Sequence, residues 1–252
     1  MKTVGIIPAR FASTRFPGKP LVMIHGKSMI QRVYEQASKS NLDYVAVATD
    51  NLQIIEHVKS FGGNVYLSSE LHPSGTDRCF EVAEILAKEW SKKPEIIINI
   101  QGDEPYVHPE QINKLASAFQ DPAVDIASLM KQITSKNDLE NNGIIKVTFQ
   151  KNHKALYFSR SIIPFPRNIS LDEALQQQVF YKHIGIYAYR MHVLEKITQL
   201  ETGTLEKVES LEQLRWLENG YEIQLIETPF ETRSVDSPSD LEILLKEQKA
   251  DE

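Results

Sequence analysis

The chain has 252 residues, 41% hydrophobic and 25% charged, with 28 Lys and Arg against 34 Asp and Glu for a net charge of −6. This composition is that of a globular protein and excludes a disordered or fibrous chain, and the acidic balance argues against a nucleic acid as the main partner. The single cysteine, Cys79, excludes an intramolecular disulfide and a cysteine zinc site, which indicates the cytoplasm, and no apolar run reaches membrane-spanning length.

The first half of the chain alternates predicted strands and helices. The strands are expected at residues 3–7, ended by Pro8, and at 44–48, 65–67 and 95–100. Helices follow them, the second capped by Thr49-Asp50 and the third started by Ser74. Such alternation implies βαβ units, so we predict an α/β protein with a doubly wound, mostly parallel sheet. The loops after Ile7, Ala48 and Ile100 are expected to share the rim that binds the ligand.

The second half contains more predicted strands than helices. Strands are expected at 126–130, 144–149, 156–159, 184–189 and 223–227, with one helix over 205–218 and a terminal helix from 239 to about 249. This β-rich part is expected to extend the sheet or to form a ribbon that serves a subunit contact. No linker or repeat divides the chain, so we predict one domain over residues 1–252.

A basic loop follows the first strand. Arg10, Arg15 and Lys19 are four to five residues apart, and the Pro17-Gly18 turn precedes the lysine. Charges and backbone N–H groups at the end of a buried strand can converge on an anion, so the pattern favours a polyphosphate ligand. The alternative is a solvated basic loop.

An acidic turn, Gln101-Gly102-Asp103-Glu104-Pro105, follows the fourth strand. A carboxylate there, near cations and phosphates, suits Mg²⁺, although Asp103 is equally well explained as a turn residue or helix cap. Asp236, considered alone, is interpreted as a turn residue.

Other motifs exclude common functions. Gly26-Lys27-Ser28 has Leu21 where a P-loop needs glycine, no G-x-G-x-x-G follows the first strand, and the seven histidines lack zinc-ligand spacing.

Two segments of the second half favour a sugar-binding surface. Tyr181, His183, Gly185, Tyr187 and Tyr189 alternate along one strand and form a wall suited to a sugar, or an ordinary edge strand. In the helix around Ser210, one side carries polar residues and Trp216, which is also typical of an ordinary amphipathic helix; these residues are Glu209, Glu212, Gln213 and Trp216.

Eight blocks of sequence, in order along almost the whole chain, resemble the family of 3-deoxy-manno-octulosonate (Kdo) cytidylyltransferases. They are PARFASTRFPGKPL from Pro8, ATD from Ala48, HPSGTDR from His72, QGDEP from Gln101, YFSR from Tyr157, HIGIY from His183, LEQLR from Leu211 and VDSP from Val235.

The resemblance implies a nucleotidyltransferase-type fold, a homodimer formed through the β-rich extension, and an enzyme that makes CMP-Kdo and pyrophosphate from CTP and Kdo with Mg²⁺ for lipopolysaccharide synthesis. It also implies three groups of site residues. Phosphate and nucleotide contacts come from Ala9, Arg10, Lys19, Ser74, Gly75 and Gln101. The metal ligands are Asp103 and Asp236, which with Arg10 and Lys19 form the catalytic set. The sugar acid is surrounded by Arg15, Arg78, Gln101, His183, Tyr189, Glu212 and Gln213.

The chemistry agrees with this assignment, because the anionic sugar must approach a triphosphate and cations offset the repulsion. No side-chain base is assigned. Sialic-acid cytidylyltransferases are the nearest alternative, but they have a glycine-rich loop where this chain has Phe11-Ala12-Ser13-Thr14. A nicotinamide-dependent oxidoreductase is disfavoured because the chain lacks the glycine motif of that class. A binding module without catalytic activity would not explain the presence of both Asp103 and Asp236.

Overall fold

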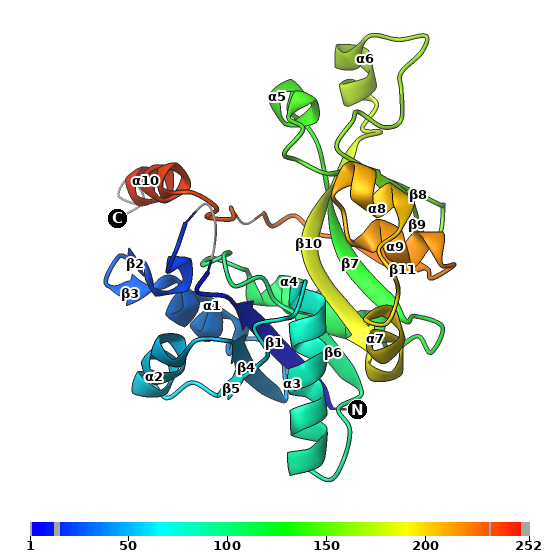
Figure 1. Ribbon diagram of the computed structural model, residues 1–252. Helices are drawn as coiled ribbons and strands as arrows, with labels where there is room; N and C mark the ends of the chain where they lie inside the picture. Colours follow the sequence, from blue (N-terminus) through cyan, green and yellow to red (C-terminus); the bar gives the residue numbers. More distant parts are fainter. Residues whose placement is uncertain (1, 13–15, 232, 248–252) are drawn as a thin grey trace. The chain divides into compact units, whose positions relative to one another are not determined.

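The computed structural model describes residues 2–12, 16–231 and 233–247 and divides the chain into two compact units (Figure 1). Unit 1 comprises residues 1–116 and 232–252, and unit 2 comprises residues 117–231. Within the described parts, no helix is long and apolar enough to cross a membrane. The prediction of one domain over the whole chain stays a prediction.

Unit 1 contains a parallel sheet in the order β6-β1-β4-β5. Its strands are β1 (Thr3–Ala9), β4 (Tyr44–Thr49), β5 (Val65–Leu67) and β6 (Ile96–Asn99). The chain builds outward from β1 on one side and then returns to place β6 on the other side. The neighbours β1 and β6 therefore form the switch point of a doubly wound sheet, where loops diverge and ligands bind.

Helices follow the strands of unit 1; those after β1, β4 and β5 and the terminal one were predicted, whereas the helix after β6 was not. The helices are α1 (Met29–Ala37), α2 (Leu52–Ser60), α3 (Gly75–Glu89) and α4 (Pro109–Ala118), with η1 (Lys19–Leu21) and the short β2 (Met23–Ile24) and β3 (Lys27–Ser28) after β1, and α10 (Pro238–Glu247) near the end. Ser74 caps α3, as expected. The predicted cap of α2 was wrong, because the side chain of Asn51, rather than Thr49 or Asp50, accepts the N–H groups of Gln53 and Ile54.

The core of unit 1 explains its sheet. Ile96, Ile97 and Ile98 are fully buried in β6, as expected of a strand covered on both faces. Pro8 was expected to end the first strand, but β1 continues through it to Ala9, and Pro8 pairs in register with Ala48. Proline is tolerated there because β6 pairs with β1 only as far as Ile6, so Pro8 removes no ladder hydrogen bond to β6.

Unit 2 is the predicted β-rich half. Its strands are β7 (Ile126–Gln132), β8 (Lys146–Phe149), β9 (Ala155–Ser159), β10 (Tyr181–Arg190) and β11 (Ile223–Glu227). β11 is parallel to β7, whereas β10–β7, β10–β8 and β8–β9 are antiparallel pairs. The helices are α5 (Lys136–Glu140), α6 (Leu171–Gln176), α7 (Met191–Ile197), α8 (Thr204–Glu209) and α9 (Gln213–Glu218).

The helix predicted over 205–218 was wrong, because the chain breaks there into α8 and α9. Ser210 lies between them in the left-handed region, with φ 54°. Its carbonyl and that of Glu209 accept hydrogen bonds from Arg160, so the chain turns instead of continuing the helix. Glu209 and Glu212 therefore do not share a helix face.

Candidate functional site

A cleft of about 280 Å³ lies in unit 1 at the ends of β1 and β6. The cleft lies at the switch point of the sheet, which is where doubly wound sheets bind their ligands. Most of the predicted phosphate, nucleotide and metal residues line it, together with Pro8, Pro20 and Gly102; those predicted residues are Ala9, Arg10, Lys19, Gly75, Gln101, Asp103 and Asp236. Arg78, predicted for the sugar acid, lines the same cleft.

Lys19 joins the two aspartates of the cleft. Its Nζ lies 2.7 Å from Oδ2 of Asp103 and 3.1 Å from Oδ1 of Asp236. The two acidic segments also meet through their backbones, because the N–H of Val235 donates to the carbonyl of Asp103 over 2.9 Å. Two carboxylates from distant parts of the sequence thus converge on one cationic position.

These residues fit a magnesium ion. Carboxylate oxygens are the hard ligands that Mg²⁺ prefers, and it is usually held by one or two of them together with substrate phosphates and water. Within the described parts of the chain, no group of three or more His, Cys, Asp or Glu residues forms a complete metal cage. Two converging carboxylates in a cleft that Arg10 and Arg78 also line are therefore the donor set expected for a metal that arrives with a nucleotide.

Two glycines allow the loops of the cleft to approach β1. A Cβ on Gly102 would lie 2.6 Å from the backbone oxygen of Pro8, and a Cβ on Gly75 would lie 3.2 Å from Cγ of Pro8. Contacts under 3.0 Å are essentially never seen for a real Cβ, so position 102 requires glycine. The absence of these side chains places the turn carrying Asp103 and the start of α3 directly against the strand.

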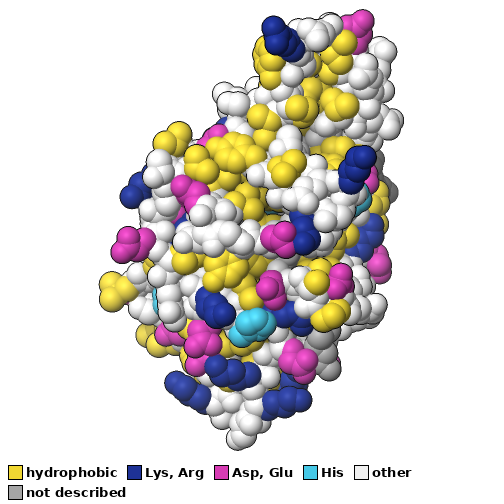
Figure 2. Space-filling view, turned by 90° about the vertical axis from the view of Figure 1, so that its right-hand side faces the viewer, with side chains coloured by type: hydrophobic (Ala, Val, Ile, Leu, Met, Phe, Trp, Pro, Cys, Tyr) yellow, Lys and Arg dark blue, Asp and Glu magenta, His cyan; other side chains and the backbone are white. Residues whose placement is uncertain are grey.

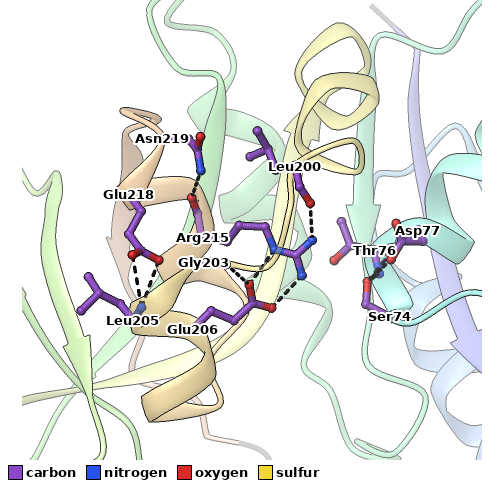
Figure 3. Close-up of polar contacts among 10 residues, drawn as sticks. All are labelled: Ser74, Thr76, Asp77, Leu200, Gly203, Leu205, Glu206, Arg215, Glu218 and Asn219. Atoms are coloured by element: carbon purple, nitrogen blue, oxygen red, sulfur yellow. Dashed lines mark hydrogen bonds and ion pairs between the residues drawn. The ribbon is translucent and has the colours of Figure 1, made fainter.

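The start of α3 is fixed by Ser74 (Figure 3). Its Oγ accepts the N–H groups of Thr76 and Asp77 at 3.1 and 3.3 Å and donates to Oδ2 of Asp77 at 2.6 Å. The helix presents Gly75 and its positive N-terminal end to the cleft, which favours an anion there. Ser74 is not among the lining residues, and its predicted nucleotide contact stays a prediction.

Arg78 is held by two residues that the sequence analysis missed. The side chain is 1% exposed, and it donates to Oγ of Ser68 at 2.6 Å and to Oδ2 of Asp50 at 2.9 Å. Asp50 follows β4 and Ser68 follows β5, so the sheet itself brings both to one rim. Their position directly after predicted strands was the available signal, but Asp50 was interpreted as a helix cap.

Unit 2 contains an aromatic cluster around two of the predicted sugar residues. His183 and Tyr189 lie on either side of Tyr187, with ring centroids 5.2 and 6.0 Å from it, and Trp216 of α9 meets both tyrosines edge-on at 5.1 and 5.6 Å. The predicted common face of these strand residues is confirmed for His183, Tyr187 and Tyr189.

Burial controls the charge of this cluster. It lowers the pKa of His183 to about 3, so the imidazole is neutral near pH 7, and Nε2 lies 2.8 Å from Oγ of Ser128. Burial and the nearby charge of Glu212 raise the pKa of Tyr187 well above its usual value. The cluster therefore contains a neutral imidazole, that of His183, and a neutral phenol, that of Tyr187, near the carboxylate of Glu212. Tyr187 was predicted as part of the aromatic wall but not as a contact of the sugar acid, and Ser128 was not predicted as a site residue.

The other predicted sugar residues are placed as follows. Glu212 is the N-cap residue of α9, and Gln213 is its first residue and is buried. Arg15 lies outside the described residues. Gln101 and Arg78 belong to unit 1, and the remaining four belong to unit 2, so the common sugar site of all seven stays a prediction.

A mostly parallel α/β sheet with a cleft at its switch point, lined here by Arg10, Lys19 and Arg78, is typical of nucleotide-binding enzymes. A family model described as cytidylyltransferase matches residues 4–225, and the chain belongs to this cytidylyltransferase family.

Named relatives agree with the family and with the predicted resemblance. The chain is 53% identical over 246 residues to a 3-deoxy-manno-octulosonate cytidylyltransferase of Parabacteroides distasonis, covering 96% of both chains. It is 45% identical over 249 residues to the enzyme of the same name from Thermodesulfovibrio yellowstonii, covering 98% of both. A solved structure of CMP:2-keto-3-deoxy-manno-octonic acid synthetase complexed with CTP superposes with a TM-score of 0.90 at 39% identity, over 100% of both chains. The predicted family and the α/β fold class are confirmed.

Proposed function

We propose that this chain is a Mg²⁺-dependent nucleotidyltransferase that couples CTP and Kdo to give CMP-Kdo and pyrophosphate, and so activates Kdo for lipopolysaccharide synthesis. The observation that carries the proposal is the convergence of Asp103 and Asp236 on Lys19 in a cleft that Arg10 and Arg78 also line. The names of the relatives support the choice of both substrates.

The unit 1 cleft is proposed to bind CTP. Ala9, Arg10 and Lys19 hold the triphosphate, because a backbone N–H and two cations at the end of β1 suit phosphate oxygens. Ser74, Gly75 and Gln101 contact the nucleotide. Asp103 and Asp236 hold the Mg²⁺, which when bound neutralises phosphate charge and orients the reacting groups.

The proposed reaction is an in-line displacement at the α-phosphorus. The 2-hydroxyl oxygen of Kdo forms the new P–O bond, the bond from the α-phosphorus to the bridging oxygen breaks, and pyrophosphate leaves with the electron pair. The hydroxyl proton is released to solvent, and no side chain is assigned as base. Arg10 and Lys19 stabilise the charge that develops on the leaving pyrophosphate.

The sugar acid is proposed to contact His183, Tyr189, Glu212 and Gln213 of unit 2, with Arg15, Arg78 and Gln101. Because His183 is neutral, its imidazole can donate or accept a hydrogen bond with the sugar without adding a charge to the site. Arg78 is proposed to contact the carboxylate of Kdo through its guanidinium, which also pairs with Asp50.

A cytoplasmic homodimer is proposed. Hydrophobic side chains gather on the upper part of the face in Figure 2, and unit 2 exposes large ones, including Phe165 at 81% and Val208 at 79%. Exposed apolar side chains of this kind are typical of a protein contact. Sedimentation equilibrium tests the dimer, and a monomer at micromolar concentration would contradict it.

The test of the function is pyrophosphate release. The purified protein is incubated with each nucleoside triphosphate, Mg²⁺ and a panel of sugar acids. We expect release only with CTP together with Kdo or its 8-amino analogue, and no release when Mg²⁺ is chelated. Release of pyrophosphate with sialic acid in place of Kdo would contradict the proposal that Kdo is the sugar substrate.

A further inference from the structure

The turn between α8 and α9 is bonded to the end of β9. Oγ of Ser159 donates to Oε1 of Glu209 over 2.6 Å, and the backbone N–H of Arg160 donates to Oε2 over 3.0 Å. Nε of Arg160 donates to the backbone carbonyl of Glu209 over 2.7 Å. Both carboxylate oxygens and the backbone carbonyl of Glu209 therefore accept hydrogen bonds from Ser159, the last residue of β9, and from Arg160, which follows it. We call this set of contacts the Ser159–Arg160 tether.

The rest of the Arg160 guanidinium fixes the backbone around the turn. Nη2 donates to the carbonyl of Ser210 over 3.4 Å, and Nη1 donates to the carbonyl of Asn142 over 3.3 Å. Ser210 has φ 54°, a left-handed conformation that costs a non-glycine residue free energy and persists only where the surroundings hold it. The hydrogen bonds from Arg160 to the carbonyls of Glu209 and Ser210 stabilise this conformation.

The hairpin of α8 and α9 is held together by contacts of its own (Figure 3). Glu206 of α8 accepts two hydrogen bonds from the guanidinium of Arg215 of α9, at 2.7 and 2.6 Å, and Arg215 also donates to the carbonyl of Leu200 over 3.0 Å. Such a two-pronged contact fixes the geometry between two helices. The position of the α8–α9 hairpin relative to the sheet of unit 2 then depends on the contacts that join the hairpin to that sheet.

We propose that Ser159 and Arg160 are positioning residues for the sugar acid, because the tether sets where Glu212 and Gln213 lie. These two residues follow the tethered Glu209 by three and four positions. Displacement of a substrate-positioning group by about 1 Å can cost on the order of a hundredfold in rate. The inference gives a role to the Tyr157–Arg160 motif, which the resemblance leaves without one, and it rests on the proposed function.

The experiment compares Michaelis constants in five variants, four of which change the tether or a control residue and the fifth of which is Glu212→Gln. Arg160→Met removes the guanidinium contacts of the tether, and Arg160→Lys restores one cation. Ser159→Ala removes the hydrogen bond to Glu209 and the one that Oγ accepts from the N–H of Ser161. Arg32→Met is the matched control, because its guanidinium also donates to backbone carbonyls, those of Ile24 and His25, in unit 1 and outside the residues lining the cleft.

We expect Arg160→Met to raise KM for Kdo at least about tenfold while KM for CTP stays within about twofold, because only the sugar side is displaced. Ser159→Ala should show a smaller rise of the same kind, and Arg160→Lys should recover part of the loss. Arg32→Met should lower the melting temperature and leave both KM values unchanged.

Two results would overturn the inference. One is a lower melting temperature of Arg160→Met and Ser159→Ala with no change in KM for Kdo, as for a merely structural contact. The other is an equal rise in both KM values. Glu212→Gln distinguishes failure of this inference from failure of the proposed sugar site. If Glu212→Gln raises KM for Kdo and Arg160→Met does not, the sugar site stands and the role of the tether is rejected. If neither Glu212→Gln nor Arg160→Met changes KM for Kdo, the sugar site and the inference both fail.

Discussion

The ammonium of Lys19 lies 2.7 Å from a carboxylate oxygen of Asp103, although 84 positions separate the two residues in the chain. Lys19 begins η1 after the first strand, and Asp103 lies in the turn after β6. The neighbouring positions of β1 and β6 in the sheet bring the two loops together. The same ammonium lies 3.1 Å from Oδ1 of Asp236, so one cation lies against both carboxylates.

Asp103→Asn is expected to reduce turnover by about a thousandfold while the chain stays folded, because an amide lacks the charge that a divalent ion requires. The carboxylate is partly exposed, so its loss leaves no buried cavity. Pyrophosphate release measures turnover, and titration with Mn²⁺ measures metal binding. Glu35→Gln is the control, since it removes a carboxylate that pairs with Lys27 at 2.6 Å on the surface. Near-normal turnover of Asp103→Asn would reject the metal-ligand role.

Lys19→Met is expected to raise KM for CTP about tenfold to a hundredfold, because it removes one cation from the phosphate side of the cleft. It also leaves Asp103 and Asp236 without their shared counter-ion. The variant should therefore melt at a lower temperature than the parent in a chelator, and Mg²⁺ should raise its melting temperature more than that of the parent. Thermal melts with and without Mg²⁺ test this, and equal shifts in both proteins would contradict it.

The sheet of unit 1 could be predicted because its signals are local. Buried parallel strands require near-continuous apolar runs, such as Ile96–Ile98, and the start of α3 is marked by a serine cap. The break between α8 and α9 could not, because the sequence 205–218 keeps a helical pattern. What ends α8 is Arg160, 49 positions away from Glu209, and no local pattern shows such a contact.

The candidate site divides in the same way. The rim after β1 and β6 follows from strand order, so Arg10, Lys19 and Asp103 could be placed from strand ends. Asp236 is separated from Lys19 by 217 positions, and only the resemblance selected it. The partners of Arg78 follow strands that were predicted, but nothing local in the sequence indicates that the ends of both β4 and β5 lie beside Arg78 of α3.

The unfolding free energy is expected to fall as pH decreases below about 6.5, because of His183. In the unfolded chain a histidine has a pKa near 6.5, whereas burial lowers the pKa of folded His183 to about 3. Between these values the unfolded chain binds a proton that the folded chain does not, which stabilises the unfolded chain. The loss at pH 5 is at most about 2 kcal/mol, and above pH 7 this group contributes no pH dependence.

Urea unfolding at pH 5 and pH 7 measures this dependence. His183→Gln should flatten it, because glutamine does not titrate. His192→Gln is the control, since the side chain of His192 is 62% exposed. If the parent and His183→Gln lose equal free energy between the two pH values, His183 titrates normally in the folded chain.

Gly102→Ala is expected to destabilise the chain by about 2–4 kcal/mol and to remove most activity. The new Cβ would lie 2.6 Å from the backbone oxygen of Pro8 and 3.5 Å from Cγ2 of Ile7. The oxygen cannot easily retreat, because β1 is paired with β4 on one side and β6 on the other. The turn must shift instead, and Asp103 shifts with it. Gly185→Ala is the stability control, since a Cβ there meets nothing within 4 Å. Urea unfolding should separate the two variants, and a Gly102→Ala protein as stable as the parent would show that the turn has room to move.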